Sequence, residues 1–248
     1  MPDRETPAVR VIAHRGASHA RPENTLVAFE HAIELGVDLI EYDVRLTHDG
    51  QTVIMHDKTV DRTTSGEGAV SDLTLEQILS FDASVGHEGY AGTRVPTLDE
   101  VCTLVAPTTV GMNVQIYADD DDRGSLTMAV TNALQRHGFD NRTFIASDEK
   151  TVLMARRLDP ARPICNLDGQ GRREIESLDT WAEQGIHIAQ PYNNVITPEY
   201  VAKAHELGIV CNVFYADDVD GMNYLIECGV DGILTNEPEL LLQVLGRR

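Results

Sequence analysis

Eight short apolar segments alternate with amphipathic segments along nearly the whole chain, and this alternation constrains the fold more than any other feature. Each apolar segment has the length of a strand, and the segments between them mostly repeat their apolar residues with helical spacing. The predicted strands cover residues 9–14, 39–46, 111–117, 143–147, 163–167, 186–190, 209–215 and 232–235. Alternation through eight strands within 248 residues favours a closed parallel (β/α)8 barrel, the TIM-barrel class, over an open doubly wound sheet.

The helical segments continue the same pattern, with one interruption after the second strand. The predicted helices cover residues 24–35, 96–105, 125–136, 148–158, 173–184, 197–207, 218–228 and 237–245. Between about residues 47 and 94 the rhythm breaks, and Asp49-Gly50 is a typical tight-turn pair followed by a short strand at 53–56 and a short helix at 74–80. We therefore expect one barrel domain over residues 1–248, with a small hairpin-based insertion at about 47–94.

The charge balance restricts the partners of such a chain. Forty Asp and Glu against twenty Lys and Arg give a formal net charge of −20, which argues against a nucleic-acid partner. No run approaches the roughly 18 apolar residues that a membrane span needs, so stable membrane insertion is not expected. The first ten residues are polar and lack the apolar core of a secretory leader, so the expected location is cytoplasmic. The sequence leaves open whether the chain forms a homo-oligomer.

Two polar clusters lie where predicted strands end, which is the active-site face of a parallel barrel. His14-Arg15-Gly16 closes the first strand, and the Arg15 guanidinium has the donor geometry that matches a phosphate group. Glu41 and Asp43 are two residues apart on the second strand and therefore face the same side. Two such carboxylates can converge on one hard cation; the alternative is that one caps a loop and the other forms a salt bridge.

A third cluster, His56-Asp57, closes the short strand that follows the Asp49-Gly50 turn. Together with His14 it offers two imidazoles, which suits a reaction that needs one base and one acid near neutral pH. The sequence near Glu41 and Asp43 lacks the sulfur and clustered imidazole ligands that zinc favours, so the expected cation is Mg²⁺ or Ca²⁺.

The order and spacing of these clusters resemble the glycerophosphodiester phosphodiesterase family over about residues 11–242. The motifs that carry the resemblance are His14-Arg15-Gly16, Pro22-Glu23-Asn24-Thr25, Glu41-x-Asp43, Asp49-Gly50, His56-Asp57, Arg62-Thr63-Thr64, the segment 95–100 and the segment 229–238. The resemblance implies metal-dependent hydrolysis of a small glycerophosphodiester to glycerol 3-phosphate and an alcohol. It also implies an ion on Glu41 and Asp43, acid–base catalysis by His14 and His56, and phosphate binding by Arg15.

The chain departs from the family pattern at two places. Members usually carry a third acidic ligand and, two residues later, a lysine; here these positions are Gln115 and Tyr117. The neutral Gln115 carbonyl can still ligate a hard cation, although more weakly than a carboxylate. A tryptophan and an asparagine common in the seventh strand are absent, and the segment contains Phe214 instead. Glu23, Tyr117 and Phe214 are candidate pocket residues.

These departures keep three functions open. The first is glycerophosphodiester hydrolysis. The second is action on another phosphodiester, or release of a cyclic phosphate through attack by the substrate's own hydroxyl. The third is a barrel that binds phosphodiesters with impaired catalysis. The two histidines and the Glu-x-Asp pair favour an enzyme, because a binding protein has no need of two acid–base groups.

Overall fold

Eight parallel strands close into a barrel because β1 (Arg10–His14) pairs with β2 (Leu39–Leu46) on one side and with β9 (Gly232–Thr235) on the other. This computed structural model describes residues 9–139, 142–171 and 177–248. The other barrel strands are β4 (Gly111–Ile116), β5 (Thr143–Ser147), β6 (Ile164–Asn166), β7 (Ile188–Ala189) and β8 (Val210–Phe214). The predicted TIM-barrel class is confirmed.

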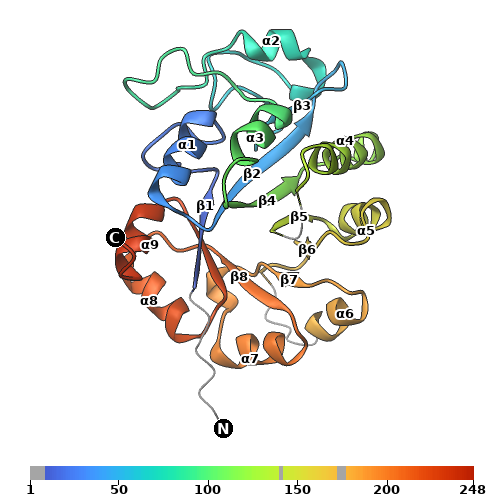
Figure 1. Cartoon of the computed structure of the whole chain (residues 1–248). Helices are drawn as coiled ribbons and strands as arrows, with labels where there is room; N and C mark the ends of the chain where they lie inside the picture. The colour runs from blue at the N-terminus through green and yellow to red at the C-terminus, as the bar shows by residue number, and fades with distance from the viewer. Residues whose placement is uncertain (1–8, 140–141, 172–176) are drawn as a thin grey trace.

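Helices form a ring around the strands, with each helix covering the strands on either side of it (Figure 1). They are α1 (Leu26–Leu35), α3 (Leu98–Val105), α4 (Arg123–Arg136), α5 (Glu149–Leu158), α6 (Ser177–Glu183), α7 (Pro198–Glu206), α8 (Val219–Glu227) and α9 (Pro238–Val244). Most predicted bounds differ from these by one or two residues. The predicted helix 173–184 corresponds to α6, and its first residues, 173–176, lie outside the described residues.

Successive side chains of a strand lie in two different apolar environments. The same alternation determines which way the polar residues at the strand ends point. In β2, Ile40 and Tyr42 are buried in the large cluster that packs under the helices. Leu39 points the other way, into a smaller cluster inside the barrel. Because side chains alternate along a strand, Glu41 and Asp43 follow Leu39 toward the barrel interior.

The insertion is built on a hairpin that continues β2 beyond the ring. Its second strand, β3 (Thr52–Ile54), pairs antiparallel with β2, and Gly50 adopts φ 74° in the turn. The turn η1 (Val70–Asp72) and the helix α2 (Leu75–Leu79) follow, as the top of Figure 1 shows. The insertion has a hydrophobic cluster of its own, the insertion cluster: Val53, Met55, Val60, Val70, Ile78, Ala83 and Val95. The predicted hairpin and short helix are thus confirmed.

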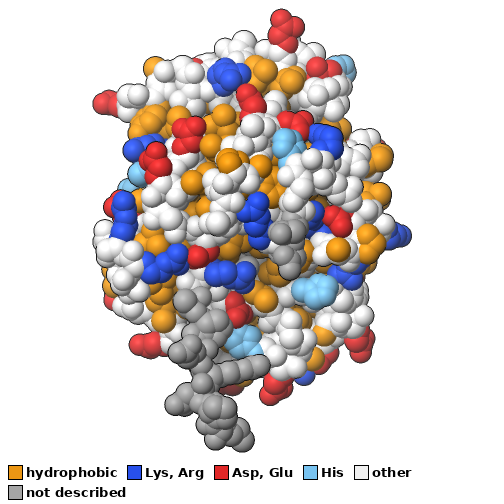
Figure 2. Space-filling view, in the orientation of Figure 1, with side chains coloured by type: hydrophobic (Ala, Val, Ile, Leu, Met, Phe, Trp, Pro, Cys, Tyr) orange, Lys and Arg blue, Asp and Glu red, His pale blue; other side chains and the backbone are white. Residues whose placement is uncertain are grey.

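The two ends of the barrel differ in chemistry. A cavity of about 540 Å³ at the amino-terminal end is lined by first residues of strands, among them Arg10, Gly111 and Val210, together with Arg142 and His187. Figure 2 shows Lys and Arg side chains gathered across the middle of one face. The candidate site residues lie at the opposite, carboxyl ends. Among the described residues, every helix is too short or too polar to span a bilayer.

Candidate active site

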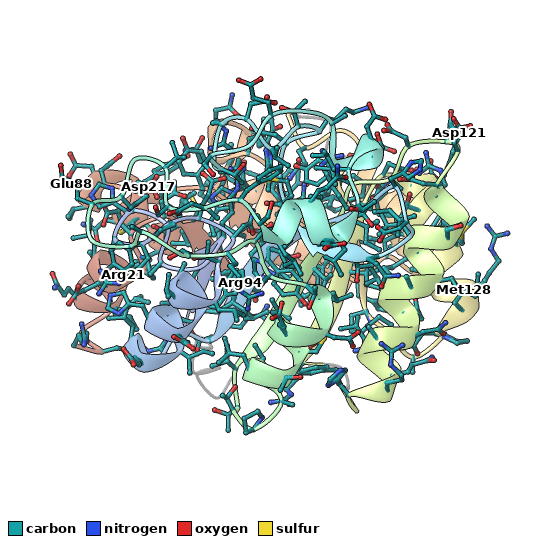
Figure 3. All side chains as sticks on the ribbon, turned by 90° about the horizontal axis from the view of Figure 1, so that it is seen from above. Arg21, Glu88, Arg94, Asp121, Met128 and Asp217 are labelled. Atoms are coloured by element: carbon teal, nitrogen blue, oxygen red, sulfur yellow. The ribbon has the colours of Figure 1, made fainter. Side chains whose placement is uncertain are left out.

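The site begins where the carboxyl ends of neighbouring strands meet. Parallel pairing sets His14, the last residue of β1, beside Glu41, and sets Asp43 beside Gln115 of β4. His14 Nε2 lies 3.9 Å from Glu41 Oε2. Loops that follow strands gather at this end: in Figure 3, Asp121 and Asp217, from the loops after β4 and β8, lie toward the same edge of the molecule.

His14 is held by a chain of polar contacts from the far end of the sequence. Its Nδ1 lies 2.7 Å from Asn236 Oδ1, and the Asn236 amide nitrogen donates to Asp217 Oδ2 at 2.6 Å. Because Asp217 fixes the amide orientation, Asn236 presents its oxygen to His14 and accepts the Nδ1–H. A neutral His14 therefore carries its proton on Nδ1, and Nε2 faces Glu41 as an acceptor.

The surroundings of the His14 ring favour this neutral form. The ring packs edge-on against Phe214 with centroids 5.0 Å apart, and parallel to Tyr215 at 6.4 Å. Burial lowers the pKa of His14, and the positive charge of Arg15 lowers it further. His14 is thus disposed to accept a proton at Nε2 rather than to hold one.

Glu41 and Asp43 form a buried carboxylate pair, each only 1% exposed. Glu41 Oε2 accepts from the Arg15 backbone N–H at 3.0 Å, and Asp43 Oδ2 accepts from Asn24 Nδ2 at 2.7 Å. Burial raises the pKa of Glu41 well above its usual range, and the Asp43 charge raises it further. Arg15 Nε lies 3.4 Å from Asp43 Oδ2, so its single positive charge balances only one of the two carboxylates. A pair of this kind suits a cation that prefers oxygen ligands.

Gln115 faces the same interior space as Asp43. Its neighbours Val114 and Ile116 pack outward under the helices, so the Gln115 side chain points into the barrel mouth, where it is half-buried. Within the part of the chain that the structure describes, no group of three or more His, Cys, Asp or Glu side chains is arranged to hold a metal. Glu41, Asp43 and the neutral Gln115 amide are oxygen donors that β2 and β4 offer here, beside Asn113, which pairs with Glu41 in register.

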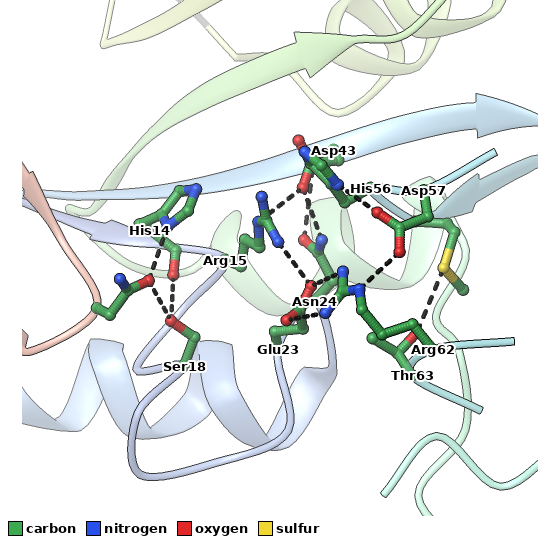
Figure 4. A network of polar contacts seen from close by, with 12 residues as sticks. His14, Arg15, Ser18, Glu23, Asn24, Asp43, His56, Asp57, Arg62 and Thr63 are labelled. Atoms are coloured by element: carbon green, nitrogen blue, oxygen red, sulfur yellow. Dashed lines mark hydrogen bonds and ion pairs between the residues drawn. The ribbon is translucent and has the colours of Figure 1, made fainter. Parts of the chain in front are cut away.

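Glu23 links the barrel to the insertion. Glu23 Oε1 accepts from Arg15 Nη1 at 2.8 Å, and both carboxylate oxygens pair with the Arg62 guanidinium at 2.8 Å. Arg62 Nε donates to Asp57 Oδ2 at 2.6 Å, and Asp57 Oδ1 lies 2.6 Å from His56 Nδ1. Figure 4 shows the resulting network, with Arg15 and Asp43 between the two histidines.

This network keeps its carboxylates ionised. Burial opposes ionisation of Glu23, but hydrogen bonds from Arg62 and the charge of Arg15 lower its pKa to about 2. The Arg62 hydrogen bond also lowers the pKa of Asp57 to about 2. Asp57 is therefore an anion, and it accepts the Nδ1–H of His56.

The loop between β1 and α1 has the backbone shape that these contacts require. Arg15 and Asn24 both adopt φ 56°, a left-handed conformation uncommon outside glycine, and Asn24 N–H donates to Arg15 O at 3.0 Å. This closure turns the Arg15 N–H toward Glu41. It also places the Asn24 side chain as a hydrogen-bond partner of Asp43. Thr25 occupies the cap position, but its hydroxyl donates to Pro22 O at 2.6 Å.

The structure thus brings together most of the predicted site residues. His14, Arg15, Glu23, Glu41 and Asp43 are joined by direct contacts. On the other side, the Tyr117 ring packs edge-on against the His56 ring at 5.2 Å. Phe214 lies on the His14 side, and Gln115 lies beside Asp43.

Three contributors were missed by the sequence analysis, and each carried a signal. Asn236 and Asp217 come directly after the last two strands, at the barrel end where functional side chains gather. Arg45 lies two residues beyond Asp43 and therefore on the same face of β2. The sequence could not show that Asn236 and Arg45 reach a histidine or that Asp217 holds Asn236, because those contacts depend on the closed barrel and its loops.

A protein-family model and a known enzyme match this chain over nearly its whole length. Residues 14–240 match the glycerophosphoryl diester phosphodiesterase family. The glycerophosphodiester phosphodiesterase of Caldanaerobacter subterraneus is 36% identical over 95% of this chain and 97% of its own length.

Solved structures share the fold of this chain. The glycerophosphodiester phosphodiesterase of Agrobacterium tumefaciens superposes with a TM-score of 0.80 at 24% identity, over 95% of this chain and 99% of that one. An Oleispira antarctica phosphodiesterase, solved with its product sn-glycerol-3-phosphate, gives 0.87 at 23% identity over 96% of each chain. The extent of the family match and the identity to the Caldanaerobacter relative show that this chain belongs to the glycerophosphoryl diester phosphodiesterase family.

Proposed function

We propose that this protein hydrolyses glycerophosphodiesters to glycerol 3-phosphate and an alcohol with the help of a divalent cation. The observation that carries the proposal is the placement of two differently partnered imidazoles, His14 and His56, on either side of the buried Glu41–Asp43 pair. The name of the Caldanaerobacter relative supports the same substrate class.

Glu41, Asp43 and the Gln115 carbonyl would hold the cation. Oxygen donors without sulfur favour Mg²⁺ or Ca²⁺. When bound, the ion would polarise a phosphoryl oxygen and neutralise charge on the buried carboxylates. Arg15 extends along the same face, and the carboxylates around it raise the pKa of its guanidinium, so it remains charged and able to pair with a phosphate oxygen.

The partners of the two histidines assign them different roles. His14 rests on a neutral amide and presents an unprotonated Nε2, so it would take the proton from the attacking water. His56 directs its Nδ1–H at the Asp57 carboxylate, which orients the ring, so His56 would act as the acid that gives a proton to the departing alcohol. Phe214 and Tyr117, which pack against His14 and His56 respectively, would border the substrate. Glu23 would orient the Arg15 guanidinium by accepting a hydrogen bond from it.

The test is hydrolysis of glycerophosphocholine with and without added Mg²⁺ or Ca²⁺. We expect activity that depends on the ion, and a loss of about 100-fold or more in turnover for His14→Ala and for His56→Ala, the scale of acid–base catalysis. His31→Ala, on α1, is the matched control and should retain turnover. Near wild-type rates for His56→Ala would contradict the two-imidazole mechanism. A cyclic phosphate as the first product would show that the substrate's own hydroxyl attacks.

A further inference from the structure

Arg45 is a buried cation at the edge of the site that the reaction described above does not use. It lies near the end of β2, two residues beyond Asp43, and is only 8% exposed. An arginine is seldom buried to this degree without partners for its guanidinium. Its partners belong to the two segments that carry His56 and Tyr117.

The Arg45 guanidinium contacts both of those segments at once. Its Nε and Nη2 both donate to the backbone carbonyl of His56, at 2.9 Å and 2.6 Å. Its central carbon lies 4.8 Å from the centre of the Tyr117 ring. The same Tyr117 ring packs edge-on against the His56 imidazole. Arg45 therefore binds the backbone of His56, Tyr117 packs against its side chain, and Arg45 and Tyr117 also contact each other.

His56 needs such support because of its position in the hairpin. β3 ends at Ile54, so His56 lies beyond the strand ladder that fixes its neighbours. Charge-assisted hydrogen bonds are short and directional, and two of them converge on the one carbonyl that orients this residue. An arginine over an aromatic face adds an attraction that strengthens when water is excluded.

We propose that Arg45 and Tyr117 form one positioning unit for His56, in which Arg45 fixes its backbone and the Tyr117 ring fixes both the guanidinium and the imidazole. Arg45, on β2, also supplies a positive charge next to Tyr117, the position at which family members usually carry a lysine on the neighbouring strand. The role of His56 as an acid rests on the proposed function, whereas the positioning itself does not.

The first test compares Arg45→Met and Arg45→Lys. Arg45→Met should lower kcat for glycerophosphocholine about 10–100-fold, the usual effect of removing an orienting group, with KM little changed. Arg45→Lys keeps the charge and one donor, so it should recover part of that loss. Arg162→Met is the matched control, because Arg162 is also buried and donates to the carbonyls of Thr143 and Phe139, away from the site. It should lower stability and leave kcat unchanged.

The second test addresses the ring. Tyr117→Phe keeps the aromatic face and should lower kcat less than Tyr117→Leu, which should lower it in the same direction as Arg45→Met. Combining Tyr117→Leu with Arg45→Met should cost less than the product of the two single effects. If Arg45→Met does not fold, the comparison of Tyr117→Phe with Tyr117→Leu still tests the positioning unit, because Arg45 is present in both variants. Equal losses in Tyr117→Phe and Tyr117→Leu would overturn the assignment to the ring.

Crystal structures provide a readout that needs no turnover. We expect the His56 carbonyl and imidazole to be displaced in Arg45→Met and unmoved in Arg162→Met. A wild-type protein that fails to hydrolyse any glycerophosphodiester would refute the proposed function, and the structures would still decide the positioning. An unmoved His56 in Arg45→Met, or a kcat equal to that of Arg162→Met, would overturn the inference.

Discussion

Gln115 determines how many carboxylates face the space between β2 and β4. Asp43 is its partner in register, and the two carboxylates of β2 meet a neutral amide there. Because affinity for hard cations depends on the charge of the ligands, Gln115→Glu should tighten binding of Mg²⁺ and Ca²⁺ by about tenfold or more. Calorimetric titration measures this. Gln51→Glu adds the same charge on the exposed hairpin turn and should leave affinity unchanged. Equal affinities in wild type and Gln115→Glu would show that Gln115 does not contact the ion.

Glu23 gives the molecule a predictable response to acid. Its pKa of about 2 in the folded protein lies below the ordinary value of 4.5, so its contribution to stability is complete above pH 4.5 and is lost as pH falls toward 2. Glu23→Gln should therefore lower the free energy of unfolding at pH 7 by roughly 2 kcal/mol, the scale of hydrogen bonds to charged groups.

The difference between wild type and Glu23→Gln should shrink as the pH is lowered from 5 to 3, measured from urea unfolding at each pH. A difference that stays constant over this range would mean that the Arg15 and Arg62 contacts do not stabilise the folded state.

At the scale of elements, β2 shows what a sequence can and cannot predict. Its bounds, 39–46, and the shared face of Glu41 and Asp43 were predicted, because alternation along a strand is a local property. Short strands such as β7 (Ile188–Ala189) were predicted too long, since pairing rather than local pattern ends them. Contacts such as His14 with Asn236, 222 residues apart, depend on barrel closure and leave no local pattern.

The insertion is predicted to respond to mutation as a unit of its own. Ile78 is fully buried in the insertion cluster, so Ile78→Ala should cost about 2–5 kcal/mol of local stability. We expect faster amide hydrogen exchange in residues 52–80 and a lower kcat, because His56 and Arg62 follow β3. Leu134→Ala, in the barrel core, is the control and should accelerate exchange in the barrel. Uniform acceleration in both variants would show that the insertion and the barrel unfold together.

At the scale of the whole molecule, charge repulsion opposes the folded state. The 40 acidic side chains outnumber the 20 Lys and Arg, and the resulting net charge of −20 repels itself more strongly in the compact state. Raising KCl from 0.05 to 1 M shortens the screening length to about 3 Å and should raise the thermal midpoint. Sucrose at matched osmolality separates screening from solute exclusion. A midpoint that falls with KCl would mean that the arginine pairs outweigh the repulsion.

The separate hydrophobic cluster of the insertion has a consequence for how such proteins diversify. A recombination event that exchanges residues 47–94 as a block transfers the insertion cluster except Val95 and replaces Ile54 in the barrel core, whereas a crossover inside the barrel divides most of one core between two parents. The junction includes the ladder between β2 and β3 and side-chain contacts such as Glu23 with Arg62 and Arg45 with His56. A lineage that conserves those contacts can acquire a new insertion around His56 while the rest of its barrel stays unchanged.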